Sequence, residues 1–173
     1  MLYAAYGSNL HPLRLQERTR SSRLVGTGAI AHHTLRFHKR GYRDFSGKCN
    51  LISQYNNTAY VAVYDIPSHE MSLLDKAEGA GAGYDRKTIA VDGFGDCIIY
   101  LAAAAHVDDS LLPFCWYKAL VVAGCEQLGF PDSYVEAVRT VKAVRDLEGD
   151  RRNLHMALVE ECQNWSRSSK KML

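Results

Sequence analysis

The sequence predicts an α+β protein with a mostly antiparallel sheet and helices packed against it. Three observations lead to this class: strand-like runs bounded by glycine fill the first two thirds of the chain, helical periodicity fills the last third, and no repeat or linker divides them. With 173 residues, 47% of them hydrophobic, the chain is long enough to bury a sizeable core. We therefore predict a single domain over residues 1–173, with a sheet that is either open or closed into a barrel.

The predicted strands are short, and most of them come in consecutive pairs. An apolar run over residues 2–6 suits a buried strand. Gly26 and Gly28 indicate a bulge or a tight bend within the next strand pair, 24–30 and 33–37. Residues 58–66 alternate in the manner of a half-buried strand. The remaining strands pair as 24–30 with 33–37 and, across a glycine-containing turn, 84–91 with 97–103.

Helical signals begin with a short segment from about Ser68 to Glu78. Pro67 precedes this helix, Ser68 can cap it, and Gly79 ends it. Three further helices are predicted over about 111–128, 133–144 and 151–165, the second capped by Asp132. Residues 166–173 form a serine-rich basic end, which we predict to be frayed.

Composition excludes several classes of function. A net charge of +2 with 23% charged residues shows no bias toward nucleic acid or membranes, and no secretory signal or membrane-length apolar run is visible. The five cysteines are odd in number and widely spaced, which favours reduced thiols in the cytoplasm. The histidines are scattered and no cysteine pair has zinc spacing, so we predict no metal and no cofactor. The sequence does not reveal the oligomeric state.

The stretch Tyr6, Gly7, Ser8, Asn9 and Leu10 is the most informative part of the chain. Glycine allows a turn where a Cβ would clash, and Ser8 and Asn9 are both favourable N-cap residues for the amphipathic segment 10–18. A strand that runs through glycine into a helix N-terminus offers unpaired N–H groups to an anion. The other interpretation is an ordinary strand–turn–helix junction.

Glu78 is the best candidate for a general acid and base. It shares an apolar helix face with Met71 and Leu74, and it lies at the helix C-terminus. Burial and the helix dipole both disfavour a negative charge there, so the sequence predicts a raised pKa. The structural alternative is a salt bridge from Glu78 to Arg86 or Lys87. Asp75 falls on another helix face and is expected to be a solvated charge.

Three glycines follow Glu78 directly, within the segment 79–83. Such a loop permits close approach of the backbone to a ligand, but it also suits a plain flexible connection. Tyr84 comes after this loop, and Tyr117 lies in the predicted helix 111–128. Tyrosines in these positions are expected to be half-buried wall residues.

Taken together, these features resemble the γ-glutamylcyclotransferase-like superfamily, over roughly residues 1–135. The motifs that carry the resemblance are Tyr6-Gly7-Ser8-Asn9-Leu10, Leu74-Asp75-Lys76-Ala77-Glu78-Gly79, Tyr84-Asp85-Arg86, and Trp116-Tyr117-Lys118 ahead of Gly129-Phe130-Pro131. The resemblance implies a small mixed, mostly antiparallel β-barrel with flanking helices and a cavity at one end.

The resemblance also implies a set of site residues. Tyr6, Gly7, Ser8, Asn9 and Leu10 would form the substrate-binding loop, Glu78 would be the catalytic acid and base, and Tyr84 and Tyr117 would support the cavity. The implied reaction cyclises a γ-glutamyl peptide or γ-glutamylamine to 5-oxoproline and releases an amino acid or amine. The expected partner is this small-molecule substrate, with neither nucleic acid nor membrane involved.

Two other interpretations remain open at this point. The chain could be a binding protein that keeps the cavity without turnover, or an accessory enzyme that removes a γ-glutamyl protecting group by the same chemistry. Glu78 argues against a pure binding role, because such a protein has little need of a carboxylate in that position.

Overall fold

The computed structural model describes the backbone of residues 1–170 and the side chains of residues 1–165. Its β-structure is one sheet with the strand order β2-β3-β1-β5-β4. All neighbouring strands pair antiparallel except β1 and β5, which are parallel. The predicted α+β class with a mostly antiparallel sheet is confirmed. The strands are β1 (Leu2–Ala5), β2 (Arg23–Arg40), β3 (Gly47–Asp65), β4 (Tyr84–Val91) and β5 (Gly95–Ala102).

The predicted barrel is not closed. β2 and β4 are the two edges of the sheet and form no ladder with each other. Near one end of the two strands, Asp92 N–H donates to the Ala29 carbonyl over 2.9 Å. Gly28 permits this approach, because a Cβ there would collide with the Val91 side chain. The sheet is therefore open, and its two edge strands come close together near Ala29 and Asp92.

A single long hairpin replaces the strands predicted over 24–30, 33–37 and 58–66. β2 and β3 pair from Arg23 with Asp65 to Arg40 with Gly47. The register shifts three times, once between Leu24 and Gly26, in the region where a bulge was predicted. Each shift interrupts the two-residue alternation, so one strand reads as two in the sequence. The other predicted hairpin, β4 with β5, is confirmed.

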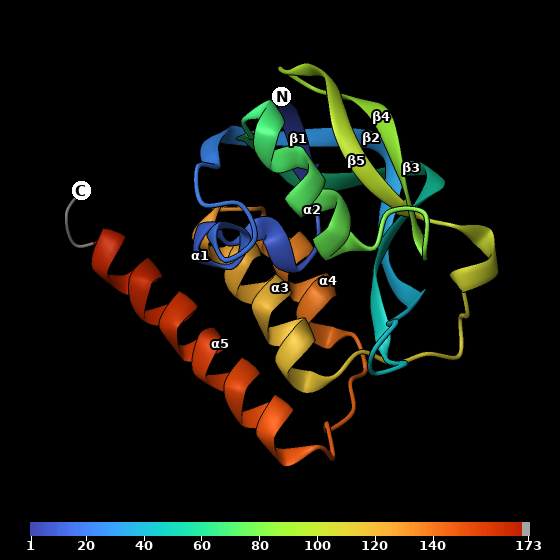
Figure 1. Cartoon of the computed structure of the whole chain (residues 1–173), viewed down its shortest axis with the longest axis vertical. Helices are drawn as coiled ribbons and strands as arrows, with labels where there is room; N and C mark the ends of the chain where they lie inside the picture. Colours follow the sequence, from blue (N-terminus) through green and yellow to red (C-terminus); the bar gives the residue numbers. More distant parts are fainter. Residues whose placement is uncertain (171–173) are drawn as a thin grey trace.

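The helices gather on one side of the sheet, and β1 lies at the centre of its strand order (Figure 1). They are α1 (Pro12–Gln16), α2 (Met71–Glu78), α3 (Cys115–Gln127), α4 (Asp132–Thr140) and α5 (Gly149–Lys170). Helix α5 packs along α3 on the outside of the molecule (Figure 1). It starts earlier and ends later than predicted, so residues 166–170 are helical, whereas 171–173 lie outside the described residues.

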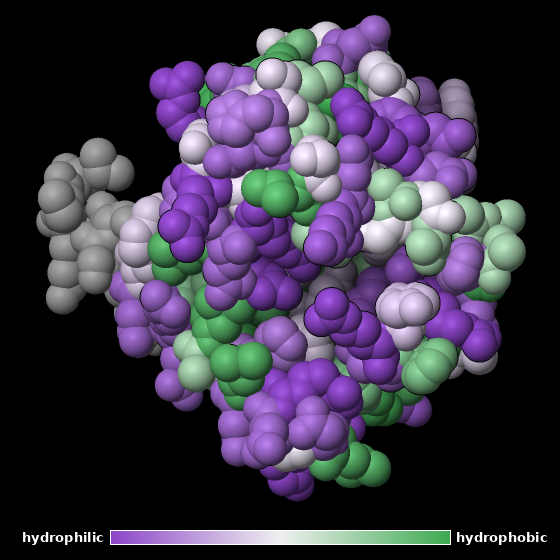
Figure 2. Space-filling model, viewed as in Figure 1, coloured by the Kyte–Doolittle hydropathy of each residue, from purple (hydrophilic) through white to green (hydrophobic). Residues whose placement is uncertain are grey.

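The hydrophobic core lies between the sheet and α3. Val61 and Val63 of β3 and Leu120 and Val121 of α3 are completely buried. In contrast, hydrophilic residues cover most of the face shown in Figure 2, and hydrophobic ones form small separate groups. Among the described residues, no helix combines the length and the apolar character needed to cross a membrane.

Candidate active site

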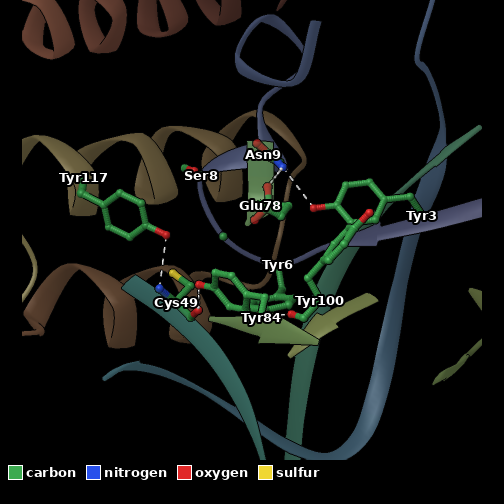
Figure 3. Close-up of a pocket in the computed structure, with 10 residues that line it drawn as sticks. Tyr3, Tyr6, Ser8, Asn9, Cys49, Glu78, Tyr84, Tyr100 and Tyr117 are labelled. Atoms are coloured by element: carbon green, nitrogen blue, oxygen red, sulfur yellow. Dashed lines mark hydrogen bonds between the residues drawn. The ribbon is translucent and has the colours of Figure 1, made fainter. Parts of the chain in front are cut away.

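A pocket opens where β1 ends and the chain turns toward α1. Glu78 is the one carboxylate among its lining residues, and tyrosine rings form most of its walls (Figure 3). The lining residues come from β1, the loop after it, β3, α2, β4, β5 and α3: Tyr3, Tyr6, Gly7, Ser8, Asn9, Cys49, Glu78, Tyr84, Tyr100 and Tyr117. Of the eight predicted site residues, seven line this pocket.

Leu10 is the predicted site residue that does not line the pocket. It is completely buried, and a Cβ on Gly124 of α3 would touch its backbone and side chain. Its carbonyl accepts a hydrogen bond from the Tyr64 hydroxyl over 2.6 Å. Leu10 therefore anchors the loop to the core instead of facing a ligand.

The loop turns in a way that the sequence did not predict. Ser8, Asn9 and Leu10 form a short 3₁₀ turn, η1, in which neither Ser8 nor Asn9 caps a helix. The N-cap of α1 is His11, whose Nδ1 accepts from the Leu13 N–H over 3.3 Å. Among the described residues, the backbone N–H groups of Gly7, Ser8 and Asn9 have no hydrogen-bond acceptor. The donors expected for an anion are thus present, without a helix N-terminus.

Gly7 packs closely against the pocket wall. Its φ is −118°, so the left-handed region is not involved. A Cβ at this position would lie 3.0 Å from the Cys49 Cβ and 3.4 Å from the Tyr117 hydroxyl oxygen. A side chain at this position would therefore require the pocket wall to shift.

Glu78 reaches the pocket from the last residue of α2. Gly79 ends the helix with φ 68° and ψ 45°, the left-handed conformation predicted for a C-terminal glycine. Met71 and Leu74 are buried on the same helix, and the Glu78 side chain is 15% exposed. Asn9 Nδ2 donates to Glu78 Oε1 over 2.7 Å, which joins the loop to the carboxylate (Figure 3).

The ion partner of Glu78 is Arg18. Its Nη1 lies 2.5 Å from Glu78 Oε1. The sequence suggested Arg86 or Lys87 as partners, but Arg86 pairs with Asp75 and Lys87 with Asp85. A cation and a donated hydrogen bond both stabilise a carboxylate, and neither of these two contacts was predicted from the sequence.

Tyr84 and Tyr117 hold the opposite wall to Cys49 of β3. Tyr84 donates its hydroxyl to the Cys49 carbonyl over 2.5 Å, and the Tyr117 oxygen accepts from the Cys49 N–H over 3.2 Å. Burial raises the pKa of both phenols well above the usual value. Burial also raises the pKa of the Cys49 thiol, which keeps it protonated and unsuited to act as a nucleophile.

Three lining residues were not predicted: Tyr3, Cys49 and Tyr100. The predicted hairpin contained a signal for Tyr100, since its register pairs Tyr100 with Arg86 and so places it on the same face as Tyr84. Tyr100 donates to Asp75 over 2.6 Å. Asp75 is therefore a structural anchor and not the solvated charge that was predicted.

Asn9 leaves part of its hydrogen-bonding capacity unused. Its Nδ2 donates to the Tyr3 hydroxyl as well as to Glu78, but its buried Oδ1 has no partner among the described residues. A buried polar atom without a partner beside a pocket is typical of a position that a ligand or water completes. No group of three or more His, Cys, Asp or Glu side chains is placed to hold a metal within the part of the chain that is described.

The fold and pocket define a class: a small α+β protein whose pocket combines free backbone N–H groups with one glutamate. The AIG2-like family model matches residues 58–138. No curated protein matches the sequence. A solved γ-glutamyl cyclotransferase superposes with a TM-score of 0.82 at 20% identity, covering 93% of this chain and 98% of that one.

Two further solved structures are similar. An uncharacterised protein from Homo sapiens gives a TM-score of 0.77 at 20% identity, over 90% of this chain and 97% of that one. YkqA from Bacillus subtilis gives 0.69 at 20% identity, over 83% of this chain and 56% of that one. The predicted resemblance to the γ-glutamylcyclotransferase-like superfamily is thus confirmed, and the chain has the γ-glutamylcyclotransferase fold.

Proposed function

We propose that this protein is a cyclotransferase that converts a γ-glutamyl peptide or γ-glutamylamine to 5-oxoproline and a free amino acid or amine. The observation that carries the proposal is the hydrogen bond between Asn9 and Glu78. It joins an anion-binding loop and a proton acceptor, 69 residues apart in the chain, across one pocket.

The reaction suits a site of this kind, because the substrate carries its own nucleophile. The α-nitrogen of a γ-glutamyl group attacks the γ-carbonyl carbon and closes a five-membered ring. The bond from that carbon to the departing nitrogen then breaks. Of the three hydrogens on the α-ammonium, one stays on the ring nitrogen and two leave with the departing amine as an ammonium. Holding the chain in the ring-closing geometry supplies much of the acceleration.

Glu78 would move the protons in this scheme. Its carboxylate, held by Arg18 and Asn9, accepts the two protons that the α-nitrogen loses, one before and one after ring closure, and delivers each to the departing nitrogen. The free N–H groups of Gly7, Ser8 and Asn9 would bind the α-carboxylate or the developing oxyanion. Tyr6, Tyr84 and Tyr117 would shape the wall around the glutamyl group.

The cysteines support a reducing compartment for this activity. All five are free thiols: Cys115 is exposed and the other four are buried. Since no disulfide stabilises the fold, we place the protein in the cytoplasm.

The first prediction concerns Glu78→Gln and Glu78→Ala. Both should reduce formation of 5-oxoproline by about a hundredfold or more, the effect typical of removing a general acid and base. The assay incubates wild type and variants with a panel of γ-glutamyl amino acids and amines and measures 5-oxoproline. Glu17→Gln is the matched control, because Glu17 also pairs with an arginine, Arg14, but does not line the pocket.

Full activity in either Glu78 variant would refute this mechanism. If the wild type produces no 5-oxoproline from any substrate but binds γ-glutamyl compounds in a calorimetric titration, the alternative of a non-catalytic binding protein is supported. Retained thermal unfolding midpoints in the variants would exclude a loss of fold as the cause.

A further inference from the structure

Tyr3 lines the pocket and takes no part in the proposed reaction scheme. It belongs to β1, the central strand of the sheet, and only 5% of the residue is exposed. Its hydroxyl oxygen accepts a hydrogen bond from Asn9 Nδ2 over 3.1 Å (Figure 3). The same Nδ2 donates to Glu78 Oε1 over 2.7 Å. One amide nitrogen therefore joins the phenol to the carboxylate.

These two hydrogen bonds together fix the orientation of the Asn9 amide. A primary amide carries two donors on its nitrogen, and a carboxylate oxygen can only accept. The nitrogen must therefore face Glu78, and its second N–H is left for the phenol of Tyr3. The last torsion of an asparagine side chain is broad, so rotamer preference alone does not set the plane of the amide. The contact to the phenol supplies the second fixed point.

The phenol is itself held rigidly. Strand β1 is paired on one side with β3 and on the other with β5. The Tyr3 ring meets Tyr100 of β5 edge-on, with centroids 5.8 Å apart. Tyr100 in turn donates its hydroxyl to Asp75 of α2 over 2.6 Å. Helix α2, which carries Glu78 as its last residue, is thus connected to Tyr3 by a second route.

The orientation of the Glu78 carboxylate decides which oxygen can move protons. Arg18 and Asn9 both donate to Oε1. Among the described residues, none forms a hydrogen bond or an ion pair with Oε2, so Oε2 is the oxygen available to a substrate. Burial raises the pKa of Tyr3 well above its usual value, so the phenol stays neutral and adds no charge beside the carboxylate.

We infer that Tyr3 is a positioning residue for the reaction, whose hydroxyl acts through Asn9 to hold the Glu78 carboxylate in the orientation for proton transfer. This inference rests on the proposed cyclotransferase function. The role belongs to the hydroxyl alone, because a phenylalanine would line the pocket with the same ring.

The test begins with Tyr3→Phe. Its kcat for 5-oxoproline formation should fall about tenfold, the size expected from one hydrogen bond, whereas KM should stay within about twofold. KM is spared because the substrate does not contact the lost hydroxyl. Tyr134→Phe is the matched control and should keep the wild-type kcat. Tyr134 packs against Tyr60 and Phe130 and does not line the pocket.

A double-mutant cycle separates positioning through Asn9 from a general loss of packing. If the phenol acts through Asn9, Tyr3→Phe should change kcat by less than about twofold once Asn9→Ala is present. Effects that multiply in the double variant would overturn the inference, and so would a wild-type kcat in Tyr3→Phe. If Asn9→Ala does not fold or is too slow to assay, Asn9→Ser takes its place in the cycle.

A second measurement does not need turnover. The side-chain amide protons of Asn9 give signals in a nitrogen–proton correlation spectrum, assigned by their loss in Asn9→Ala. Tyr3→Phe should shift these signals and speed their exchange with solvent, and Tyr134→Phe should not. Unchanged Asn9 signals in Tyr3→Phe overturn the inference. If the wild type forms no 5-oxoproline, the proposed function fails, and the role of Tyr3 in the reaction fails with it even where the spectrum changes.

Discussion

At the scale of single residues, the chemistry of the pocket depends on how Glu78 is held. Arg18 and Asn9 both contact Glu78 Oε1. Arg18 lies in the segment after α1, and Glu78 is the last residue of α2. The cation and the carboxylate therefore come from separate parts of the chain. These two contacts hold the Glu78 side chain in place beside the loop after β1.

We expect Arg18→Met to lower kcat/KM for 5-oxoproline formation by about tenfold or more, because Glu78 loses the charge-assisted contact that holds its side chain. The measurement is kcat/KM of wild type and variant at pH 7. Arg18→Lys should restore the activity in part, since it returns the charge.

Arg14→Met serves as the control for this experiment. Arg14 pairs with Glu17 over 2.5 Å, and neither residue lines the pocket. An Arg18→Met variant that keeps the wild-type kcat/KM would contradict the role assigned to this ion pair.

At the scale of elements, the pocket forms where residues from several helices and strands meet. The α2 C-terminus delivers Glu78, the β4–β5 hairpin delivers Tyr84 and Tyr100, and α3 delivers Tyr117. Helix α3 in turn is fixed by Asp146, a residue that precedes α5. Asp146 accepts from Trp116 Nε1 of α3 over 2.9 Å and pairs with Arg151 of α5 over 2.5 Å.

This cluster gives a prediction about stability in acid. The hydrogen bond from Arg151 holds the pKa of Asp146 well below its usual range. Asp146→Asn should therefore lower the free energy of unfolding at pH 7 by about 1–2 kcal/mol. An unfolded aspartate titrates near pH 4 and the folded one lower, so the difference between wild type and variant should shrink below about pH 4.

Urea unfolding of both proteins at pH 7 and pH 3 checks this prediction. Asp150→Asn is the comparison, because Asp150 lies in the first turn of the same helix, and among the described residues its side chain forms no hydrogen bond or ion pair with α3. A difference that stays constant between pH 7 and pH 3 would contradict the assigned titration of Asp146.

At the scale of the whole molecule, the strand order places the loop after β1 at the centre of the sheet. Because β1 lies between β3 and β5, the chain leaves β1 in the middle of the sheet and turns directly under α3. His11 then connects this loop to the far end of α5. Its ring is completely buried and lies edge-on to Trp165, with centroids 5.2 Å apart.

The burial of His11 leads us to predict that stability also depends on pH in a second, separate range. Burial lowers the pKa of His11 to about 4, from 6.5 in an unfolded chain. The unfolded state therefore binds more protons between these values, and stability should fall as the pH decreases from about 6.5 to about 4. His11→Asn keeps a favourable N-cap and removes the titration, so its unfolding free energy should change less over this range.

The measurement is urea unfolding of wild type and His11→Asn at half-unit steps from pH 4 to pH 7. Parallel curves for the two proteins would show that another group is responsible for the pH dependence.

Features set by residues close together in sequence were predicted correctly, whereas features that depend on bulges or on distant contacts were missed. The β4–β5 hairpin and the end of α2 at Gly79 were predicted because turn residues and glycine act within a few positions. The long β2–β3 hairpin was missed because its bulges break the alternation. The prediction that Ser8 and Asn9 cap a helix was wrong. The Asn9 side chain donates to Glu78 across the pocket, and His11 caps α1.

The sequence by itself determined the fold class, the loop Tyr6 to Asn9 and the glutamate that faces it, since glycine, periodicity and motif spacing are local properties of the chain. Only the tertiary structure decided what surrounds Glu78 and the rest of the pocket. Arg18 reaches Glu78 from a segment far away in sequence, and burial of a charge depends on everything packed around it. For that reason, the ion partner of the glutamate emerges only after the chain is folded.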